Sequence, residues 1–427
     1  MGTTVANSFY IKTIGCKLNY TESAGIVDFL LNNNCAHVDK SNADVFILNT
    51  CSVTGQAEKK CIQELRTFHK INPAAPVIVT GCFANLNAEN IEKEKNVTIV
   101  AGKDMQQKRA TILHFILTRK KESAANLSDT FSLVWSNTRT RCFLKIQDGC
   151  DNKCAYCTVH LARGGSRSAT IREVCDTMRN IAKLDVKEVV LTGLNTADFG
   201  RKNGEQFIDL LQEIEKLNGV NRYRISSIEP NLLTEELILF VKNSNSFLPH
   251  FHIPLQSGSD RVLRLMGRRY LTAHFKNTIE QIKKHIPDAF IGIDIIAGMN
   301  GETADDFADS YNFVKSMPVS FLHVFPYSER PNTNAVNFTP KVPSIEKQKR
   351  TKQYLALSDE KLRSFYKANT GKTFDVLFET VSNGVYHGFT PNYIKVELQS
   401  SINLRNRIIS VTLSEFNPET GRMTGVV

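Results

Sequence analysis

Apolar residues in the first hundred positions alternate between short strand-like runs and helical patterns. The strand-like runs occupy residues 9–13, 45–48, 77–79 and 97–100, and the helical patterns occupy 21–31, 54–70 and 86–94. A regular alternation of strands and helices is typical of a parallel sheet flanked by helices. We therefore predict an N-terminal parallel α/β sheet domain over residues 8–101.

The same alternation returns in the middle of the chain. Strands are predicted near 142–147, 187–192, 222–228, 249–255, 289–297 and 319–325, with amphipathic helical patterns such as 170–183 and 303–316. Sequential parallel strands of this kind predict a six-stranded partial (β/α) barrel, whose functional residues gather at the carboxyl ends of the strands. A long helix over 343–370 completes this part, which we assign to residues 142–370.

Two further segments complete the predicted organisation. Residues 102–141 form a basic linker with one helix near 104–117. Residues 371–427 alternate apolar and polar positions in short runs separated by turn residues. This pattern predicts a small antiparallel β-barrel of the kind that often carries nucleic acid. The predicted fold class is thus α/β, with a small β-barrel at the C-terminus.

Cys150, Cys154 and Cys157 follow the first central strand within eight residues. Soft thiolates at this spacing select zinc or iron–sulfur clusters over hard cations. Three cysteines would leave one iron of a [4Fe–4S] cluster open, whereas a structural zinc site would be completed by His160. The spacing alone leaves both open. The aromatic Tyr156 and the predicted barrel favour the cluster, because Cys-x3-Cys-x-aromatic-Cys resembles the motif of the radical S-adenosylmethionine (SAM) superfamily.

Three more cysteines occupy equivalent positions in the N-terminal part. Cys16, Cys51 and Cys82 each follow one of its first three predicted strands. Because the carboxyl ends of neighbouring parallel strands share one edge, we expect these thiols to converge. Gly15 and Gly81, directly before two of them, let the backbone approach a bulky inorganic centre. The alternative is three ordinary loop cysteines; the shared position at strand ends favours a second three-thiolate cluster.

The ends of the central strands carry polar or otherwise unusual residues instead of packing residues. Serine and glycine at such places have ordinary roles as helix caps and turns. Glu229 differs, because Pro230 follows it and it opens no clear helix. A carboxylate there is suited to the ribose hydroxyls or the amino group of SAM. The residues that we expect to bind SAM are Tyr156, Gly193, Asn195, Ser227, Glu229, Gln256, Asp294 and Phe325.

Composition narrows the class of protein and the class of partner. The net charge of +10 comes largely from residues 102–145 and 341–372, each with nine Lys or Arg against three Asp or Glu. Such concentration indicates a polyanion partner, with nucleic acid favoured over solvated helix faces. There is no membrane-spanning apolar run and no signal-peptide pattern, so we expect a cytoplasmic protein. Ten cysteines then indicate metal or catalytic use, although Cys35, Cys61, Cys142 and Cys175 look like buried apolar residues.

With both cysteine sets in place, the whole chain resembles the radical SAM methylthiotransferases. The similarity runs through an N-terminal cluster domain, a SAM barrel and a small C-terminal TRAM barrel. Its specific motifs are Gly15-Cys16-Lys17-Leu18-Asn19, Asn49-Thr50-Cys51, Thr80-Gly81-Cys82, the Cys150 motif, Arg163-Gly-Gly-Ser-Arg167, His252-Ile-Pro-Leu-Gln-Ser-Gly258 and Gly301-Glu302-Thr303. One departure is Gly298-Met-Asn-Gly301, where the family usually has Gly-Phe-Pro-Gly.

The resemblance implies two [4Fe–4S] clusters and SAM as cofactors. The cluster at Cys150, Cys154 and Cys157 would reduce SAM to a deoxyadenosyl radical, and the one at Cys16, Cys51 and Cys82 would hold the sulfur. Radical chemistry is needed because C2 of an adenine carries an inert C–H bond, and the protein's task is placement and exclusion of water and oxygen. A flavodoxin or ferredoxin is the expected electron donor, and we expect a monomer.

Within the family the chain looks most similar to the branch that acts on N6-threonylcarbamoyladenosine beside the tRNA anticodon. Lys17 stands where the relatives specific for a prenylated base usually have Gln, and we expect it to help neutralise the threonyl carboxylate. The alternative is that Lys17 only tunes the cluster or points to solvent. Arg163 and Arg167 are further expected substrate contacts. The alternatives are an enzyme for isopentenyladenosine tRNA or a ribosomal protein, and a non-catalytic cluster-bearing RNA-binding protein.

Overall fold

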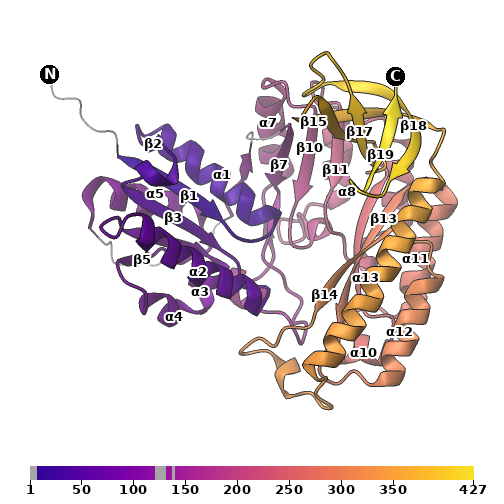
Figure 1. The fold of residues 1–427 in the computed structure, drawn as a ribbon, viewed down its shortest axis with the longest axis horizontal. Helices are drawn as coiled ribbons and strands as arrows, with labels where there is room; N and C mark the ends of the chain where they lie inside the picture. The colour runs from indigo at the N-terminus through magenta and orange to yellow at the C-terminus, as the bar shows by residue number, and fades with distance from the viewer. Residues whose placement is uncertain (1–6, 121–130, 137–139) are drawn as a thin grey trace.

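The computed structural model describes residues 7–120, 131–136 and 140–427, which form three connected parts (Figure 1). Much of the predicted basic linker, including Lys121 and Arg139, therefore lies outside the described residues. The fold class is mixed α/β with parallel sheets, as predicted. In the part of the chain that the structure describes, no helix is both long and apolar enough to cross a membrane.

The N-terminal part is a parallel sheet with the strand order β2-β1-β3-β4-β5. The strands are β1 (Ser8–Thr13), β2 (Ala36–His37), β3 (Val45–Thr50), β4 (Val77–Gly81) and β5 (Val97–Ile99). Alternate side chains point to opposite faces, so Val45 and Ile47 pack beneath α1 (Lys17–Leu31) and α5 (Met105–Thr118). Phe46 and Leu48 pack against α2 (Gly55–Ile71) on the other face. The four predicted strands are confirmed; β2 is too short for its pattern to be recognised.

Two helices of the N-terminal part differ from their predicted form. The helix predicted over 86–94 is two helices, α3 (Cys82–Leu86) and α4 (Ala88–Glu92), because Asn87 between them leaves the helical conformation. The prediction was therefore wrong about where this helix begins. Helix α5, predicted as part of a linker, packs against the N-terminal sheet through Ile112 and Ile116.

The central part holds two neighbouring sheets. Strands β7 (Arg141–Lys145), β10 (Glu188–Thr192) and β11 (Arg222–Ile225) run parallel, and β6 (Val134–Ser136) adds to β7 in the antiparallel direction. Strands β12 (His250–Gln256), β13 (Phe290–Ala297) and β14 (Phe321–Pro326) form the second, all-parallel sheet. A parallel bridge between Ser227 and His252 continues one sheet into the other. These six parallel strands correspond to the predicted ones.

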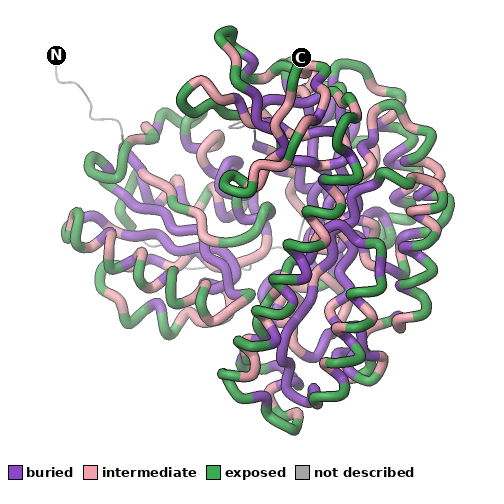
Figure 2. Tube along the Cα trace, turned by 45° about the vertical axis from the view of Figure 1, so that its right-hand side comes forward, coloured by how far each residue is buried: buried purple, intermediate pink, exposed green. Residues whose placement is uncertain are grey.

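Helices cover the outer face of the central strands, while the inner face is left for the functional site (Figures 1 and 2). The covering helices are α7 (Ile171–Ala182), α8 (Phe207–Glu215), α9 (Glu235–Asn243), α11 (Thr272–His285), α12 (Ala304–Ser316) and α13 (Ser344–Lys367). Figure 2 shows buried strands surrounded by helices with exposed outer faces. The core between these layers includes Cys142, and Cys35, Cys61 and Cys175 are also buried, as predicted.

The C-terminal part is a closed barrel with the strand order β15-β16-β17-β19-β18. Its strands are β15 (Thr373–Ser382), β16 (Val385–Phe389), β17 (Lys395–Gln399), β18 (Ile408–Asn417) and β19 (Arg422–Val426). The pairing of β17 with β19 is parallel, so the barrel is not antiparallel throughout as predicted. Arg222 at the start of β11 donates a hydrogen bond to the Asp375 carbonyl, which places this barrel at the amino ends of the central strands, opposite the site below.

Candidate active site

The first three-cysteine set lies at the carboxyl edge of the N-terminal sheet. Cys16 immediately precedes α1, Cys51 immediately follows β3, and Cys82 opens α3 directly after β4. The thiols of Cys82 and Cys16 are close enough to raise the pKa of Cys51 electrostatically, in addition to the larger effect of burial. The structure thus brings together three cysteines that lie 31 to 35 residues apart in the sequence.

Gly81 makes this convergence possible. Its φ of +93° lies in a region that residues with a side chain rarely adopt, and an added Cβ would lie 2.4 Å from the carbonyl oxygen of Thr50. Strands β3 and β4 therefore approach each other closely just where Cys51 and Cys82 leave them. A glycine is required at this point for steric reasons.

The second set lies on a single loop between β8 (Gln147–Asp148) and α6 (Val159–Arg163). The loop is fixed at both ends by backbone hydrogen bonds, from Cys150 N–H to the Gly164 carbonyl and from Ala155 N–H to the Met266 carbonyl, each 3.0 Å long. Cys154 is buried, while Cys150 and Cys157 are partly buried. The loop extends from the carboxyl end of β7, as predicted.

Sulfur atoms of both sets accept hydrogen bonds from nitrogen donors. The backbone N–H groups of Val53, Asn152 and Val159 each donate to the cysteine two residues earlier, over 3.4 Å. Arg163 Nε donates to Cys82 Sγ and Arg268 donates to Cys154 Sγ, each over 3.2 Å. Such donors stabilise negative charge on sulfur, which a metal-bound thiolate carries.

Burial opposes deprotonation of several of these thiols as long as no metal is bound. Burial raises the pKa of Cys51 and of Cys157 to about 12, and that of Cys150 to about 11. Metal binding must therefore displace protons from these thiols. Within the described ranges, no three His, Cys, Asp or Glu side chains are spaced to hold a single metal ion.

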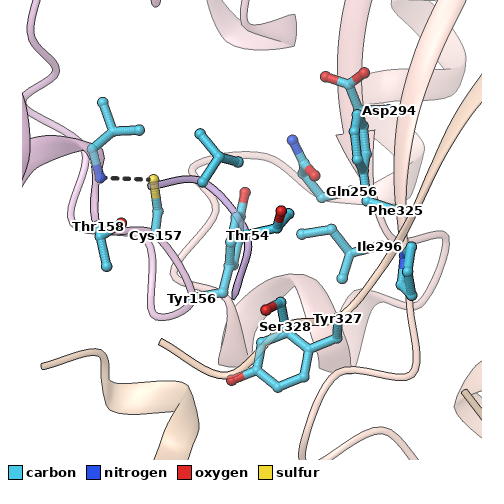
Figure 3. Close-up of a pocket in the computed structure, with 13 residues that line it drawn as sticks. Thr54, Tyr156, Cys157, Thr158, Gln256, Asp294, Ile296, Phe325, Tyr327 and Ser328 are labelled. Carbon is cyan, nitrogen blue, oxygen red and sulfur yellow. Dashed lines mark hydrogen bonds between the residues drawn. The ribbon is translucent and has the colours of Figure 1, made fainter. Parts of the chain in front are cut away.

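An open pocket of about 760 Å³ separates the two cysteine loops. Val53 and Thr54, which follow Cys51, line one side of it, and Tyr156, Cys157 and Thr158 line another. Figure 3 shows Gln256, Asp294 and Phe325 across the pocket from Cys157, and the dashed line marks the hydrogen bond to the Cys157 sulfur.

Four of the eight residues predicted to bind SAM line this pocket: Tyr156, Gln256, Asp294 and Phe325. Gln256 ends β12 with a φ of +70°, at an irregularity in its pairing with β13. Burial acts to raise the pKa of Asp294, but the His252 ring 2.8 Å away outweighs burial and lowers it. Asp294 therefore presents a charged carboxylate to the pocket.

The other four predicted SAM residues, Gly193, Asn195, Ser227 and Glu229, do not line this pocket. Gly193 and Asn195 lie against the Gln147 side chain, which accepts hydrogen bonds from Leu194 N–H and Asn195 N–H over 2.9 and 3.0 Å. The Asn195 Oδ1 atom is buried without a hydrogen-bond partner. Glu229 forms an ion pair with Arg268, and its charge acts on the nearby Cys150 thiol. This group therefore lies on the Cys150 side of the loop.

The predicted substrate residues have different surroundings. Lys17 opens α1 and keeps an exposed surface, yet burial by the surrounding protein lowers its pKa, with Tyr393 opposing that effect. The Lys17 side chain is therefore reached by solvent although protein groups lie around it. Arg163 and Arg167, in contrast, are shielded from solvent in an ion cluster, with only 7% and 13% of their side chains exposed.

Sequence reasoning missed several residues of this site. Val53 and Thr54 reach the pocket from the N-terminal part, and Tyr327 and Ser328 reach it from beyond β14. Arg268 contacts both the Cys154 sulfur and the Tyr156 hydroxyl, although it lies more than a hundred residues away in the sequence. The sequence around it, Gly267-Arg-Arg-Tyr270, offers no spacing that predicts this contact.

Comparisons with known proteins agree with this geometry. Residues 144–314 match the Radical SAM superfamily, and residues 8–102 match the family described as Uncharacterized protein family UPF0004. The solved structure of the radical S-adenosylmethionine methyltransferase TsrM from Kitasatospora setae, with tryptophan substrate and a SAM analog bound, is similar with a TM-score of 0.55. The match covers 75% of this chain and 73% of that one at 11% identity, so it concerns the fold alone.

Sequence relatives cover almost the full chain. The threonylcarbamoyladenosine tRNA methylthiotransferase MtaB of Bacillus subtilis is 33% identical over 419 residues, 94% of this chain and 92% of its own. The protein of that name from Thermotoga maritima is 33% identical over 91% of this chain and 90% of its own. The tRNA-2-methylthio-N(6)-dimethylallyladenosine synthase of Endomicrobium trichonymphae is 30% identical over 96% of this chain and 97% of its own.

The fold, the three-cysteine loop and the superfamily match define a radical SAM enzyme. The chain belongs to the methylthiotransferase family of these enzymes. Membership implies SAM and a [4Fe–4S] cluster as cofactors. The residues present fit that cluster, because Cys150, Cys154 and Cys157 are free thiols on one loop, each with a nitrogen donor at hydrogen-bond distance from its sulfur.

Proposed function

We propose that this enzyme transfers a methylthio group to C2 of N6-threonylcarbamoyladenosine beside the anticodon of tRNA, using two [4Fe–4S] clusters. The observation that carries the proposal is the pocket lined by Cys157 on one side and by Val53 and Thr54, which follow Cys51, on another, so that a substrate base placed there would lie between the two cysteine loops. Cys150, Cys154 and Cys157 are the ligands of the cluster that, when bound, supplies the electron for cleavage of SAM. Cys16, Cys51 and Cys82 are the ligands proposed for the second cluster, which supplies sulfur.

The chain's own residues position the reactants in this scheme. Asn195, Ser227 and Glu229 lie on the Cys150 side and are proposed to hold the amino acid or ribose groups of SAM. Tyr156, Gln256, Asp294 and Phe325 line the space where the radical and the base would meet. Because loops from both halves of the site enclose this space, they limit the access of water to it.

The domain organisation belongs to the same proposal. Residues 8–101 form the domain of the second cluster, and 142–370 form the radical SAM domain, a six-stranded partial barrel with its C-terminal helix. Residues 102–141 connect them, and 371–427 form a TRAM-type barrel. We further propose a cytoplasmic monomer that receives electrons from a flavodoxin or ferredoxin.

Basic residues on α13 are proposed to contact the tRNA backbone. Lys349 and Lys352 are exposed on this helix. Arg350 between them is buried, because its guanidinium donates to Glu302 over 2.6 Å, and it is thereby excluded from phosphate contact. The electrostatic attraction thus comes from fewer side chains than the sequence count implies.

The choice of the threonylcarbamoyl base is supported by the names of the relatives from B. subtilis and T. maritima and by Lys17. This base carries a carboxylate, which is costly to bury unpaired. Lys17 directly follows Cys16 and keeps an exposed surface, so its ammonium is proposed to pair with such a group. The name of the relative from E. trichonymphae favours the prenylated base as the second candidate.

The test offers anaerobically reconstituted enzyme, SAM and a reductant to tRNAs that carry either modified base, followed by mass spectrometry of nucleosides. We expect a methylthio group on the threonylcarbamoyl base. Lys17→Gln should lower the rate with this tRNA roughly ten- to hundredfold, the value of one hydrogen bond to a charged group. Lys40→Gln, an exposed lysine in the short helix Lys40–Asn42, is the matched control and should not change the rate. Modification of the prenylated tRNA alone would overturn the choice of base.

A further inference from the structure

Arg163 connects the two cysteine sites. It is the last residue of α6, which follows directly on the loop of Cys150, Cys154 and Cys157. Its Nε atom nevertheless donates a hydrogen bond to the sulfur of Cys82, in the other set, over 3.2 Å. Only 7% of the Arg163 side chain is exposed, so water does not screen this contact.

The rest of the guanidinium is held by carboxylates from both parts of the protein. Its terminal nitrogens donate to Glu22 on α1 over 2.8 and 3.3 Å, and to Asp148, two residues before Cys150, over 3.1 Å. Burial acts to raise the pKa of Glu22, but Arg163 and Lys145 outweigh it and lower that pKa to about 2. Both carboxylates are therefore ionised at neutral pH, and the orientation of Arg163 is fixed on two sides.

The group of charged side chains around Arg163 carries more positive than negative charge. Lys145 lies 3.2 Å from both Glu22 and Asp148, and Arg167 lies 3.5 Å from Asp148. Three cations thus share two carboxylates next to Cys82, and the buried Lys108 also lies near enough to act on Glu22, although burial lowers the pKa of Lys108. An excess of buried positive charge is costly unless an anion compensates it. The Cys82 sulfur, in its deprotonated and metal-bound form, is an anion at hydrogen-bond distance.

We propose that Arg163 is a positioning residue that raises the reduction potential of a cluster held by Cys16, Cys51 and Cys82, and that it holds this site against the SAM site. The inference rests on the second cluster of the proposed function. Reduction adds one negative charge to a cluster, so a charge-assisted hydrogen bond to a ligand sulfur favours the reduced form. The sequence led us to expect that Arg163 contacts the substrate. We assign it this positioning role instead, because Glu22, Asp148 and Cys82 enclose its guanidinium.

Arg268 makes the corresponding contact in the SAM site, where it donates to Cys154 Sγ over 3.2 Å and pairs with Glu229. In each site, therefore, one arginine donates a hydrogen bond to one cysteine sulfur. The difference is that Arg268 and Cys154 belong to the same part of the chain, whereas Arg163 reaches Cys82 across the boundary between two parts. A purely structural role for Arg163 would keep those parts together without changing the electron affinity of the site.

The test uses protein with Cys150, Cys154 and Cys157 changed to Ala, so that only the second cluster remains. Its midpoint potential is measured by redox titration with electron paramagnetic resonance. Adding Arg163→Gln should lower the ratio of reduced to oxidised cluster at a fixed potential about tenfold, equivalent to a shift of about 59 mV for one electron. Arg163→Lys keeps the charge without the planar fork and should shift the potential less. Arg167→Gln, which removes a cation of the same group that does not bond Cys82, is the matched control.

The outcomes separate the inference from the proposed function. A parent protein without iron overturns both, since there is then no second cluster. Full iron with equal potentials in parent, Arg163→Gln and Arg163→Lys overturns the role of Arg163 alone, as do equal shifts in Arg163→Gln and Arg167→Gln. If Arg163→Gln fails to fold because Glu22 and Asp148 are left unpaired, the Arg163→Lys shift decides: a lower potential supports the role, and no shift overturns it.

Discussion

The two cysteine sites differ in how the backbone supplies their thiols. One loop supplies Cys150, Cys154 and Cys157, whereas the carboxyl ends of three neighbouring strands supply Cys16, Cys51 and Cys82. In the first case the geometry is local, and three backbone hydrogen bonds tie the loop to neighbouring segments at Gly164, Met266 and Ala335. In the second case the geometry is tertiary, because it depends on the register of β1, β3 and β4. The two sites nevertheless provide similar surroundings for sulfur.

This similarity lies in the hydrogen-bond donors. A backbone N–H two residues further along the chain contacts Cys51, Cys150 and Cys157, and an arginine contacts Cys82 and Cys154. The two cysteine sets therefore share the same kinds of donor, while the backbone that provides them differs. Errors in folding should affect the two sites unequally, since only the sheet-based site depends on distant contacts.

The largest expected effect is the separation of the two reactions. With Cys16, Cys51 and Cys82 changed to Ala, SAM should still be cleaved reductively to deoxyadenosine, but no thiolated tRNA should form. With Cys150, Cys154 and Cys157 changed to Ala, both reactions should stop. Chromatography for deoxyadenosine and mass spectrometry of nucleosides measure the two products. Thiolation at the rate of the unmodified enzyme in the first variant would show that those cysteines do not supply the sulfur.

A smaller but still large effect is expected from Gly81→Ala. The added Cβ would lie 2.4 Å from the Thr50 carbonyl oxygen, so β3 and β4 must separate where Cys51 and Cys82 begin. About four of eight iron atoms should be lost, with the iron of the loop-based site retained. Gly204→Ala is the matched control, because Gly204 also has a positive φ, +75°, but nothing lies within 4 Å of its Cβ position. Equal iron contents in Gly81→Ala and Gly204→Ala would contradict the steric role proposed for Gly81.

The two cysteine sets were recognised in the sequence for two different reasons. The loop set was recognised by its spacing together with Tyr156 and the predicted barrel, and the sheet-based set was recognised because each cysteine follows a strand. Contacts between distant segments were not predictable in this way. Neither Arg163 on Cys82 nor Arg268 on Cys154 follows from spacing, because each depends on how separate elements pack. Similarly, Arg350 sits in a basic run, but only the fold shows that Glu302 pairs with it in the interior.

The buried ion pairs of Glu22 with Lys145 and Arg163 should also affect the folding stability of the protein. Glu22→Gln breaks a buried ion pair and should lower the free energy of unfolding of the metal-free protein by about 3–5 kcal/mol at pH 7. The folded pKa of Glu22, about 2, lies below its ordinary value of 4.5, so its contribution is present above pH 4.5 and is lost as the pH falls towards 2. The difference between the variant and the unmodified protein should therefore shrink over that interval in urea denaturation.

The exposed pair of Arg66 with Glu94 provides the control for this measurement, because 66% of the Arg66 side chain is exposed. Glu94→Gln should cost at most about 1 kcal/mol at any pH. A cost for Glu22→Gln no larger than that of Glu94→Gln would contradict the role assigned to the buried cluster.

Iron content tests the central claim, that the chain builds two separate three-cysteine cluster sites, most directly. After anaerobic reconstitution, iron and acid-labile sulfide are measured in the unmodified protein and in each triple cysteine-to-alanine variant. We predict about eight iron atoms per chain for the unmodified protein and about four for each variant. Four in the unmodified protein, or stoichiometric zinc in place of iron, would contradict the claim.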